Sequence, residues 1–193
     1  MVGPAGVGKT SIVSRMNGQE YNIITECTVG CAFSVLTFDD QSVEVWDTAG
    51  QEKYKSLGPI YYRNAGILIF TFDVSIPTTI EDMIGFIEYF YQHMPAGTTD
   101  GVKIIVVGNK TDRYHQPREY LTSRFQIHPL IKLHQLDHIE PVYVSASSGH
   151  GIQDLIDKIS KTVSILSGKR IDLEMINEVK LEEIHPALTG GCC

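Results

Sequence analysis

The chain has 193 residues, which is enough for one domain with a well-buried core. Hydrophobic residues make up 42% and charged residues 20%, as in ordinary globular proteins, so disorder of the whole chain is excluded. The net charge of −7 argues against a nucleic-acid-binding protein, whose binding surface would be basic.

No stretch of about 18 apolar residues occurs, so the sequence predicts no membrane-spanning segment. The first residues lack the basic and apolar regions of a signal peptide, and we therefore expect a cytosolic protein. The cysteines, Cys27, Cys31, Cys192 and Cys193, are expected to be reduced in that compartment. An extended segment would hold Cys27 and Cys31 about 13 Å apart, too far for a disulfide.

Residues 3–10 read GPAGVGKT, the complete pattern of a phosphate-binding loop. Inward-facing backbone N–H groups and the N-terminus of the following helix bind phosphate in such loops. Lys9 is predicted to contact the β- and γ-phosphates, and the Thr10 hydroxyl to ligate Mg²⁺. The alternative, a glycine-rich turn that matches by chance, is disfavoured by the amphipathic segment that follows. The predicted phosphate-binding residues of this loop are Gly3, Ala5, Gly6, Val7, Gly8, Lys9 and Thr10.

The remaining elements are predicted from periodicity and from turn residues. The phosphate-binding loop should lead into a helix from about residue 9 to 17, followed by a polar loop over 21–30. Alternating and continuous apolar runs predict strands at 32–38, 42–46, 66–74, 102–107 and 141–144. Two further helices are expected, one after a capping box formed by Thr78 and Glu81 and one over 152–163.

This alternation predicts an α/β fold with a mainly parallel sheet, one antiparallel hairpin strand and helices on both faces. The strand that normally precedes a phosphate-binding loop is largely missing, because only Met1 and Val2 come before Gly3. We expect a nucleotide-binding domain over residues 1–166 and a flexible, variable tail over 167–193. Residues 114–140 show the weakest pattern, and their histidines are expected to lie on the surface without a role.

A second motif, Asp47-Thr48-Ala49-Gly50, directly follows a predicted strand. Asp47 can hold a Mg²⁺-bound water there, and the Gly50 N–H can approach the γ-phosphate because no side chain intervenes. Gln51 is the predicted catalytic residue, orienting the attacking water. A strand that ends in Asp-x-x-Gly is also a common turn, so the motif gains its meaning from the phosphate-binding loop.

A third motif, Asn109-Lys110-Thr111-Asp112, ends another predicted strand. The Asp112 carboxylate can accept hydrogen bonds from N1–H and the 2-amino group of guanine. Adenine offers neither donor, so such a site rejects it by a large factor. The Lys110 stem can cover one face of the base, and Tyr21 is an aromatic candidate for contact with its edge. The alternative is a simple Asx turn at a strand end.

Two further positions complete the predicted nucleotide site. Ser145 and Ala146 follow the last predicted strand, and the Ala146 N–H can bond O6 of guanine. Thr28 lies in the polar loop, where its hydroxyl can complete the Mg²⁺ shell when a γ-phosphate is present. That loop is therefore a candidate switch, ordered by the triphosphate and released after hydrolysis.

With these motifs in place, the chain resembles a Rab-type small GTPase of the Ras superfamily, over roughly residues 1–163 and the terminal Cys-Cys. The stretch WDTAGQEKYKSLGPIYYRNA (46–65) is the most Rab-like, and its KYKSLGPIYYRNA portion (53–65) is similar to early-endosomal members. The resemblance implies a six-stranded sheet, GTP or GDP with Mg²⁺, and slow intrinsic hydrolysis. It also implies an exchange factor, a GTPase-activating protein, Rab escort protein, GDP-dissociation inhibitor and effectors.

TVGCAF (28–33) matches the family's first switch, which makes Phe33, Trp46 and Tyr61 the candidate effector surface; the alternative is that they are ordinary core residues. The end of the chain resembles a doubly geranylgeranylated Rab tail, so Cys192 and Cys193 are the predicted lipidation sites. A lipid anchor there implies the cytoplasmic face of endomembranes, with cycling through the cytosol.

Some residues depart from the family pattern. Ala5 places a methyl group beside the γ-phosphate, which predicts low intrinsic turnover. Ser147 replaces the usual lysine after Ser145-Ala146, which predicts somewhat weaker guanine binding without loss of specificity. Because so little precedes Gly3, we expect an N-terminally shortened chain, and the alternative function is a non-cycling nucleotide-binding scaffold or inactive fragment.

Overall fold

The computed structural model describes residues 1–24, 27–38, 41–50, 58–95, 97–99, 101–114 and 117–182. Its strands are β1 (Cys31–Phe38), β2 (Gln41–Thr48), β3 (Ile67–Asp73), β4 (Lys103–Asn109) and β5 (Val142–Tyr143). Its helices are α1 (Lys9–Met16), α2 (Gly58–Tyr62), α3 (Thr78–His93), α4 (Arg118–Gln126), α5 (Pro129–Leu133) and α6 (Ile152–Glu182), with a 3₁₀ turn, η2, at Thr111–Arg113. The predicted α/β fold is confirmed, and helices and strands lie close to their predicted positions.

The strands form an antiparallel pair and a parallel sheet. Strand β1 pairs with β2 along its whole length, with Phe33 opposite Trp46. Strand β4 lies between β3 and β5 and is parallel to both. Burial alternates along β2, as expected of a strand with one solvated face, whereas β3 is buried along nearly its whole length. The predicted hairpin and the parallel strands are therefore both present.

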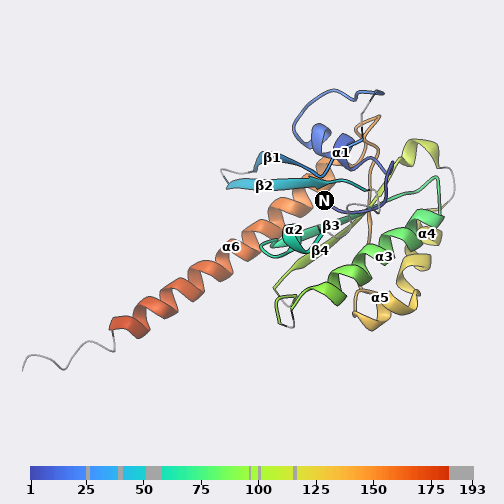
Figure 1. Cartoon of the computed structure of the whole chain (residues 1–193). Helices are drawn as coiled ribbons and strands as arrows, with labels where there is room; N and C mark the ends of the chain where they lie inside the picture. Colours follow the sequence, from blue (N-terminus) through green and yellow to red (C-terminus); the bar gives the residue numbers. More distant parts are fainter. Residues whose placement is uncertain are drawn as a thin grey trace, which may run out of the picture.

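Met1 and Val2 join the two groups of strands. The Val2 N–H donates to the Ile69 carbonyl at 2.8 Å, and the Thr71 N–H donates to the Val2 carbonyl at 2.8 Å. On the other side, the Met1 ammonium donates to the Trp46 carbonyl at 2.6 Å, and the Thr48 N–H donates to the Met1 carbonyl at 3.2 Å. Figure 1 shows the N-terminus between β2 and β3. In place of a full first strand, the structure has a single parallel bridge between Val2 and Phe70.

Side chains along a strand point alternately to the two faces of its sheet, so the apolar parallel strands carry apolar side chains on both faces. Helices cover both of these faces. On one face, Leu68, Phe70 and Phe72 of β3 pack in the same hydrophobic cluster as residues of α3, α4 and α5. On the other face, Ile69 and Ile105 pack with residues of α1, α6, β1 and β2. Figure 1 shows α3, α4 and α5 gathered on one side of the strands. The result is a three-layer α/β/α arrangement.

Helix α6 is longer than the sequence predicted. It runs without interruption from Ile152 to Glu182, across the predicted boundary between residues 166 and 167, and Figure 1 shows it extending away from the domain. Residues 169–182 are rich in strong helix formers such as Lys, Arg, Leu, Met and Glu, which allow a helix to propagate beyond its packed turns. The division into a domain and a flexible tail stays a prediction.

The segment after β4, which showed the weakest sequence pattern, contains the short helices α4 and α5. His134, expected on the surface without a role, is instead partly buried between α5 and α3. Its Nε2 lies 2.7 Å from a carboxylate oxygen of Glu88, and its ring stacks on Tyr91 with centroids 3.9 Å apart. The hydrogen bond lowers the pKa of the Glu88 carboxyl. Sequence periodicity missed this contact because its partners are 46 residues apart.

The predicted capping box at α3 is wrong. The N-cap is Pro77, which makes no side-chain cap, and Thr78 is already the first helical residue. The neighbouring Thr79 instead connects the start of α3 to the end of β3, because its hydroxyl donates to the Ile76 carbonyl at 2.7 Å and accepts from the Asp73 N–H at 3.0 Å. Glu81 turns outward and forms an ion pair with Arg124 of α4.

The buried ammonium of Met1 predicts a pH-dependent stability for a chain whose free α-amine is that of Met1. Burial lowers its pKa from 8.0 to about 6, against the opposing charge of Asp47. Between these values the unfolded state binds more protons, so the free energy of unfolding should rise from pH 6 to pH 8, by at most about 3 kcal/mol. Urea denaturation across this range measures it.

The control for this prediction is the same chain with its α-amine acetylated. Acetylation removes the titrating group, so any pH dependence that persists belongs to histidines and other residues. The prediction fails if the free and acetylated chains show the same change in stability between pH 6 and pH 8.

Candidate nucleotide-binding site

The loop over residues 3–10 has the backbone of a phosphate cradle. Gly8 has a φ of 91°, in the left-handed region that favours glycine, and leads directly into α1. A Cβ at Gly8 would collide with the side-chain amide of Asn109, so the fold requires a glycine there for a second reason. Gly6 and Gly3 also have positive φ. The amide groups of the loop and the first turn of α1 can therefore converge on an anion.

Lys9 lies inside this loop. Its Nζ donates to the carbonyls of Gly3 and Pro4, each at 2.9 Å, and the side chain is 6% exposed. Burial lowers the pKa of Lys9 to about 8, while the nearby Asp47 carboxylate raises it. A buried ammonium held mainly by carbonyl groups is stabilised by an anion, so this position is suited to a phosphate.

Asp47, Thr10 and Thr28 converge as the sequence predicted for a magnesium site. The Thr10 hydroxyl lies 2.6 Å from Asp47 Oδ2 and 2.9 Å from the Thr28 hydroxyl, which in turn lies 3.4 Å from Asp47 Oδ2. Asp47 Oδ1 is buried and has no hydrogen-bond partner. One carboxylate and two hydroxyls are the hard oxygen donors that Mg²⁺ accepts, with waters and phosphate completing its shell. The residues therefore fit the ion.

Gly50 packs directly against the phosphate-binding loop. A Cβ at this position would collide with Lys9 Nζ and with the backbone of Pro4. Only glycine lets the end of the Asp47–Gly50 segment approach the phosphate-binding loop this closely. This contact brings the second predicted motif against the first, as its proposed role at the γ-phosphate requires.

Asn109 ties the phosphate-binding loop to the loops after β4 and β5. It ends β4 and is 1% exposed. Its Nδ2 donates to the Val7 carbonyl at 2.8 Å, and its Oδ1 accepts from the Ala146 N–H at 3.1 Å. The Ala146 N–H, which the sequence assigned to O6 of guanine, thus points to Asn109 in this structure. One amide side chain fixes the spacing between the phosphate and base ends of the site.

Lys110 is held between the phosphate-binding loop and β3. It has a φ of 68°, and its Nζ donates to the Gly6 carbonyl at 2.7 Å. The same Nζ forms an ion pair with Asp73 Oδ2 at 2.6 Å; the Asp73 side chain is 3% exposed and that of Lys110 is 24% exposed. Asp73 Oδ1 accepts from the hydroxyl of Ser75. The Lys110 stem is therefore fixed where it can cover a base.

Asp73 is a site residue that sequence reasoning missed. Its signal was a carboxylate at the end of an otherwise apolar buried run, GILIFTFDV (66–74). In the structure Asp73 pairs in register with Asn109, and both lie at the carboxyl ends of parallel strands. Charged residues at this edge of a parallel sheet belong with its ligand site.

Asp112 lies in η2 beside the loop after β5. Ser145, fully buried, donates its hydroxyl hydrogen to Asp112 Oδ1 at 2.5 Å. Burial raises the pKa of Asp112, but hydrogen bonds from the Ser145 and Ser147 hydroxyls and from the backbone, with the charge of Arg113, together lower it more, so this pKa lies below its usual value. The carboxylate is thereby kept ionised as a hydrogen-bond acceptor.

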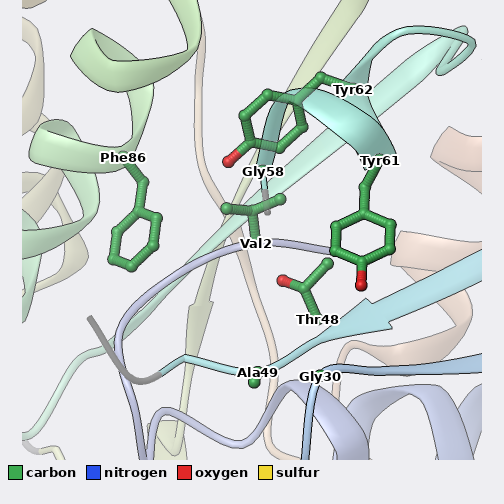
Figure 2. Close-up of a pocket in the computed structure, with 8 residues that line it drawn as sticks. All are labelled: Val2, Gly30, Thr48, Ala49, Gly58, Tyr61, Tyr62 and Phe86. Carbon is green, nitrogen blue, oxygen red and sulfur yellow. The ribbon is translucent and has the colours of Figure 1, made fainter. Parts of the chain in front are cut away.

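Tyr21 lies beside α1 on the wall of a cavity of about 330 Å³ that also includes Thr10 and Ser11. Tyr21 thus lines the same cavity as Thr10. A second, much smaller pocket of about 10 Å³ lies near α2, with room for about one water (Figure 2). Val2, Tyr62 and Phe86 contribute to its wall, and it is too small for a nucleotide.

The predicted aromatic trio is assembled on the surface. Phe33 and Trp46 face each other across β1 and β2 with ring centroids 5.3 Å apart, and Trp46 lies 5.9 Å from Tyr61 of α2. Phe33 is 52% exposed and Trp46 is 45% exposed. The alternative that these two rings are core residues is therefore wrong. By contrast, the adjacent Tyr62 is buried against Phe90.

Other predictions fall partly or wholly outside the described residues. Gln51, Cys192 and Cys193 lie there, so their assigned roles stay predictions. Within the described part of the chain, Cys27 and Cys31 are free thiols, as expected. No helix in that part is both long and apolar enough to span a bilayer.

Burial predicts that breaking the Lys110–Asp73 pair is costly. Lys110→Met leaves the buried Asp73 carboxylate without its cation and should lower the free energy of unfolding by about 3 kcal/mol. The control is Arg124→Met, which breaks an ion pair of the same 2.6 Å length with the exposed Glu81 and should cost less than about 1 kcal/mol. Urea denaturation measures the free energy of unfolding of both variants. Equal losses would contradict the conclusion that the Lys110–Asp73 ion pair is the buried one.

Comparison with known proteins agrees with this geometry. The sequence pattern of the Ras family matches residues 1–165. The GTP-binding protein ypt5 of Schizosaccharomyces pombe is 36% identical over 123 residues, which cover 61% of this chain and 56% of ypt5. Ras-related protein RABA2a of Arabidopsis thaliana is 32% identical over 60% of this chain and 53% of its own length. The chain therefore spans about half the length of these two relatives.

A third relative matches along the whole chain. Ras-related protein Rab-11A of Dictyostelium discoideum is 27% identical over 100% of this chain and 92% of its own length. The matched residues contain the phosphate-binding loop, the Asp47–Gly50 segment and the Asn109–Asp112 motif, all of which meet at one edge of the sheet. The chain belongs to the Ras family, and the relatives that it resembles carry Ypt and Rab names.

Proposed function

We propose that this protein is a molecular switch that binds GTP and GDP with Mg²⁺ and hydrolyses GTP. The single observation that carries this proposal is the side chain of Asn109, which joins the carbonyl of Val7 to the amide of Ala146. It couples a phosphate cradle to a pair of loops that carry Lys110, Asp112 and Ser145. An isolated phosphate-binding loop has no need of this connection.

The phosphate end of the site would bind and neutralise the triphosphate. Lys9 exchanges its carbonyl partners for the β- and γ-phosphate oxygens, and the loop amides from Gly3 to Thr10 surround the phosphates. Thr10, Thr28 and Asp47 would hold Mg²⁺, which neutralises developing charge on the phosphates. Gly50 presents its N–H to the γ-phosphate, and Gln51 orients the attacking water.

The base end of the site would select guanine. Asp112 accepts hydrogen bonds from N1–H and the 2-amino group, and the stem of Lys110 covers one face of the ring. Adenine would leave this carboxylate unpaired, at a large cost in affinity. Tyr21 is the proposed aromatic neighbour of the bound nucleoside.

The switch would act through the segment that carries Thr28. Its hydroxyl contacts Thr10 and Asp47, so a γ-phosphate and Mg²⁺ would add contacts that GDP cannot supply. The exposed rings of Phe33 and Trp46 contact each other, and Trp46 contacts the partly buried ring of Tyr61 on α2. We propose these three rings as the surface that effectors bind. Effector binding would then depend on which nucleotide is present.

We further propose a role in vesicle traffic on endosomal membranes. Its support is the resemblance of residues 53–65 to early-endosomal Rab proteins and the Rab names of the relatives. Cycling would need an exchange factor and a GTPase-activating protein. Delivery and extraction would need Rab escort protein and GDP-dissociation inhibitor. The anchor would be lipid on Cys192 and Cys193, on the cytoplasmic face of the membrane.

Hydrolysis separates a cycling switch from a non-cycling scaffold. Gln51→Leu should slow single-turnover GTP hydrolysis at least tenfold, because water positioning is lost, while the affinities for GDP and GTP stay within about twofold. The measurement is phosphate release from protein preloaded with GTP. A wild-type chain that binds GTP without hydrolysing it, even with a GTPase-activating protein, would favour the scaffold.

Membrane residence should require both terminal cysteines. One lipid chain gives only reversible attachment, so replacing either Cys192 or Cys193 by serine should move most of the protein from membranes to the cytosol. Cell fractionation measures this, with Cys27→Ser as the matched control because Cys27 is an exposed thiol elsewhere in the chain. An unchanged distribution after loss of both terminal cysteines would rule out the anchor.

A further inference from the structure

Ser147 stands where the resemblance to the family would place a lysine, and the structure gives its hydroxyl a specific neighbour. Ser147 Oγ lies 3.0 Å from Ser145 Oγ, in the first half of the loop that joins β5 to α6. Ser147 is exposed, whereas Ser145 is fully buried beneath it. The next link is the 2.5 Å contact between Ser145 Oγ and Asp112 Oδ1. The three side chains form a row that ends on the carboxylate proposed to read the base.

The direction of the hydrogen bonds follows from the number of hydrogens. A serine hydroxyl donates once, and an ionised carboxylate only accepts. Ser145 therefore donates its hydrogen to Asp112, and in its contact with Ser147 it is the acceptor. The Ser147 hydroxyl also lowers the pKa of Asp112, so it lies close to that carboxylate as well as to Ser145. Ser145 Oγ also accepts from the Ser148 N–H at 3.1 Å, which fills its second acceptor position. Hydrogen bonds in such a chain polarise one another, so the bond to Asp112 is strengthened by the bond from Ser147.

We infer that Ser147 is a positioning residue for guanine recognition, holding the Asp112 carboxylate in place through Ser145. This inference rests on the proposed binding of guanine nucleotides and adds a residue to that site. With Oδ1 engaged by Ser145, the rotation of the carboxylate is fixed. Asp112 Oδ2 lies 3.9 Å from Arg113 Nε, which is too long for a hydrogen bond, so Arg113 does not compete with the donors of a base for this oxygen.

Serine at position 147 should affect guanine binding differently from the lysine that the family resemblance would place there. A lysine at this position would cover the base with its stem but would place no hydroxyl hydrogen on Ser145. Serine cannot cover the base, but its hydroxyl helps to hold the Asp112 carboxylate, which accepts from N1–H and the 2-amino group. Replacing Ser147 should therefore reduce the preference for a base that carries a 2-amino group more than it reduces the overall affinity for the nucleotide.

The test compares dissociation of GDP and of IDP, whose hypoxanthine base lacks the 2-amino group. Ser147→Ala should speed GDP release about three- to tenfold, the effect of one hydrogen bond. IDP release should rise less, because IDP makes fewer bonds to Asp112, so the preference for GDP over IDP falls. Ser147→Thr keeps the hydroxyl and should show the wild-type preference for GDP over IDP. Ser148→Ala is the matched control, since the Ser148 hydroxyl accepts from the His150 N–H and only its backbone contacts Ser145.

The outcomes separate this inference from the proposed function. If wild-type protein prefers GDP to ADP but Ser147→Ala releases GDP at the wild-type rate, the relay is wrong and the proposed function stands. Equal acceleration of GDP and IDP would also overturn it, because it would indicate general loosening of the loop. Wild-type protein that binds GDP no better than ADP would overturn the proposed function and the relay together.

Discussion

The backbone hydrogen bonds of Met1 and Val2 connect the β1–β2 hairpin to the parallel sheet, and the geometry of the site depends on them. These residues bond to Trp46 and Thr48 on one side and to Ile69 and Thr71 on the other. The phosphate-binding loop begins immediately afterwards, at Gly3. Its position between Asp47 at the end of β2 and Asn109 at the end of β4 is thus set by this connection. A shift of the hairpin would carry Asp47 away from Thr10.

At the carboxyl ends of the strands, glycines and polar side chains fit together closely. Gly8 leaves room for the amide of Asn109, and Gly50 leaves room for Lys9. Asn109, Lys110 and Asp73 then connect the loops through bonds that are largely buried. Parallel strands bring their carboxyl ends to one edge, so motifs separated by about a hundred residues form one site. The residues proposed to bind the phosphates and those proposed to bind the base are therefore connected through Asn109.

The sequence predicted those parts of the structure that depend on residues close together in the chain. The apolar run of β3 and the glycine pattern before α1 predict their own conformations, and the motifs at 3–10, 47–50 and 109–112 predict their own chemistry. The contacts it missed join residues far apart in the sequence: His134 with Glu88, and Lys110 with Asp73. For Ser147 the sequence predicted only weaker guanine binding, because its hydrogen bond to Ser145 depends on the geometry of the loop. It ended the last helix too early, because the later turns of α6 lack the apolar periodicity on which that prediction rested.

The central claim is that this edge of the sheet holds a guanine nucleotide with Mg²⁺. It is tested most directly by identifying the nucleotide that the protein carries after gentle purification in magnesium. The bound material is released by denaturation, separated by chromatography and quantified against protein. The account predicts close to one GDP or GTP per chain, displaced by added GDP and not by ATP. A bound adenine nucleotide, or equal displacement by ATP and GTP, would contradict it.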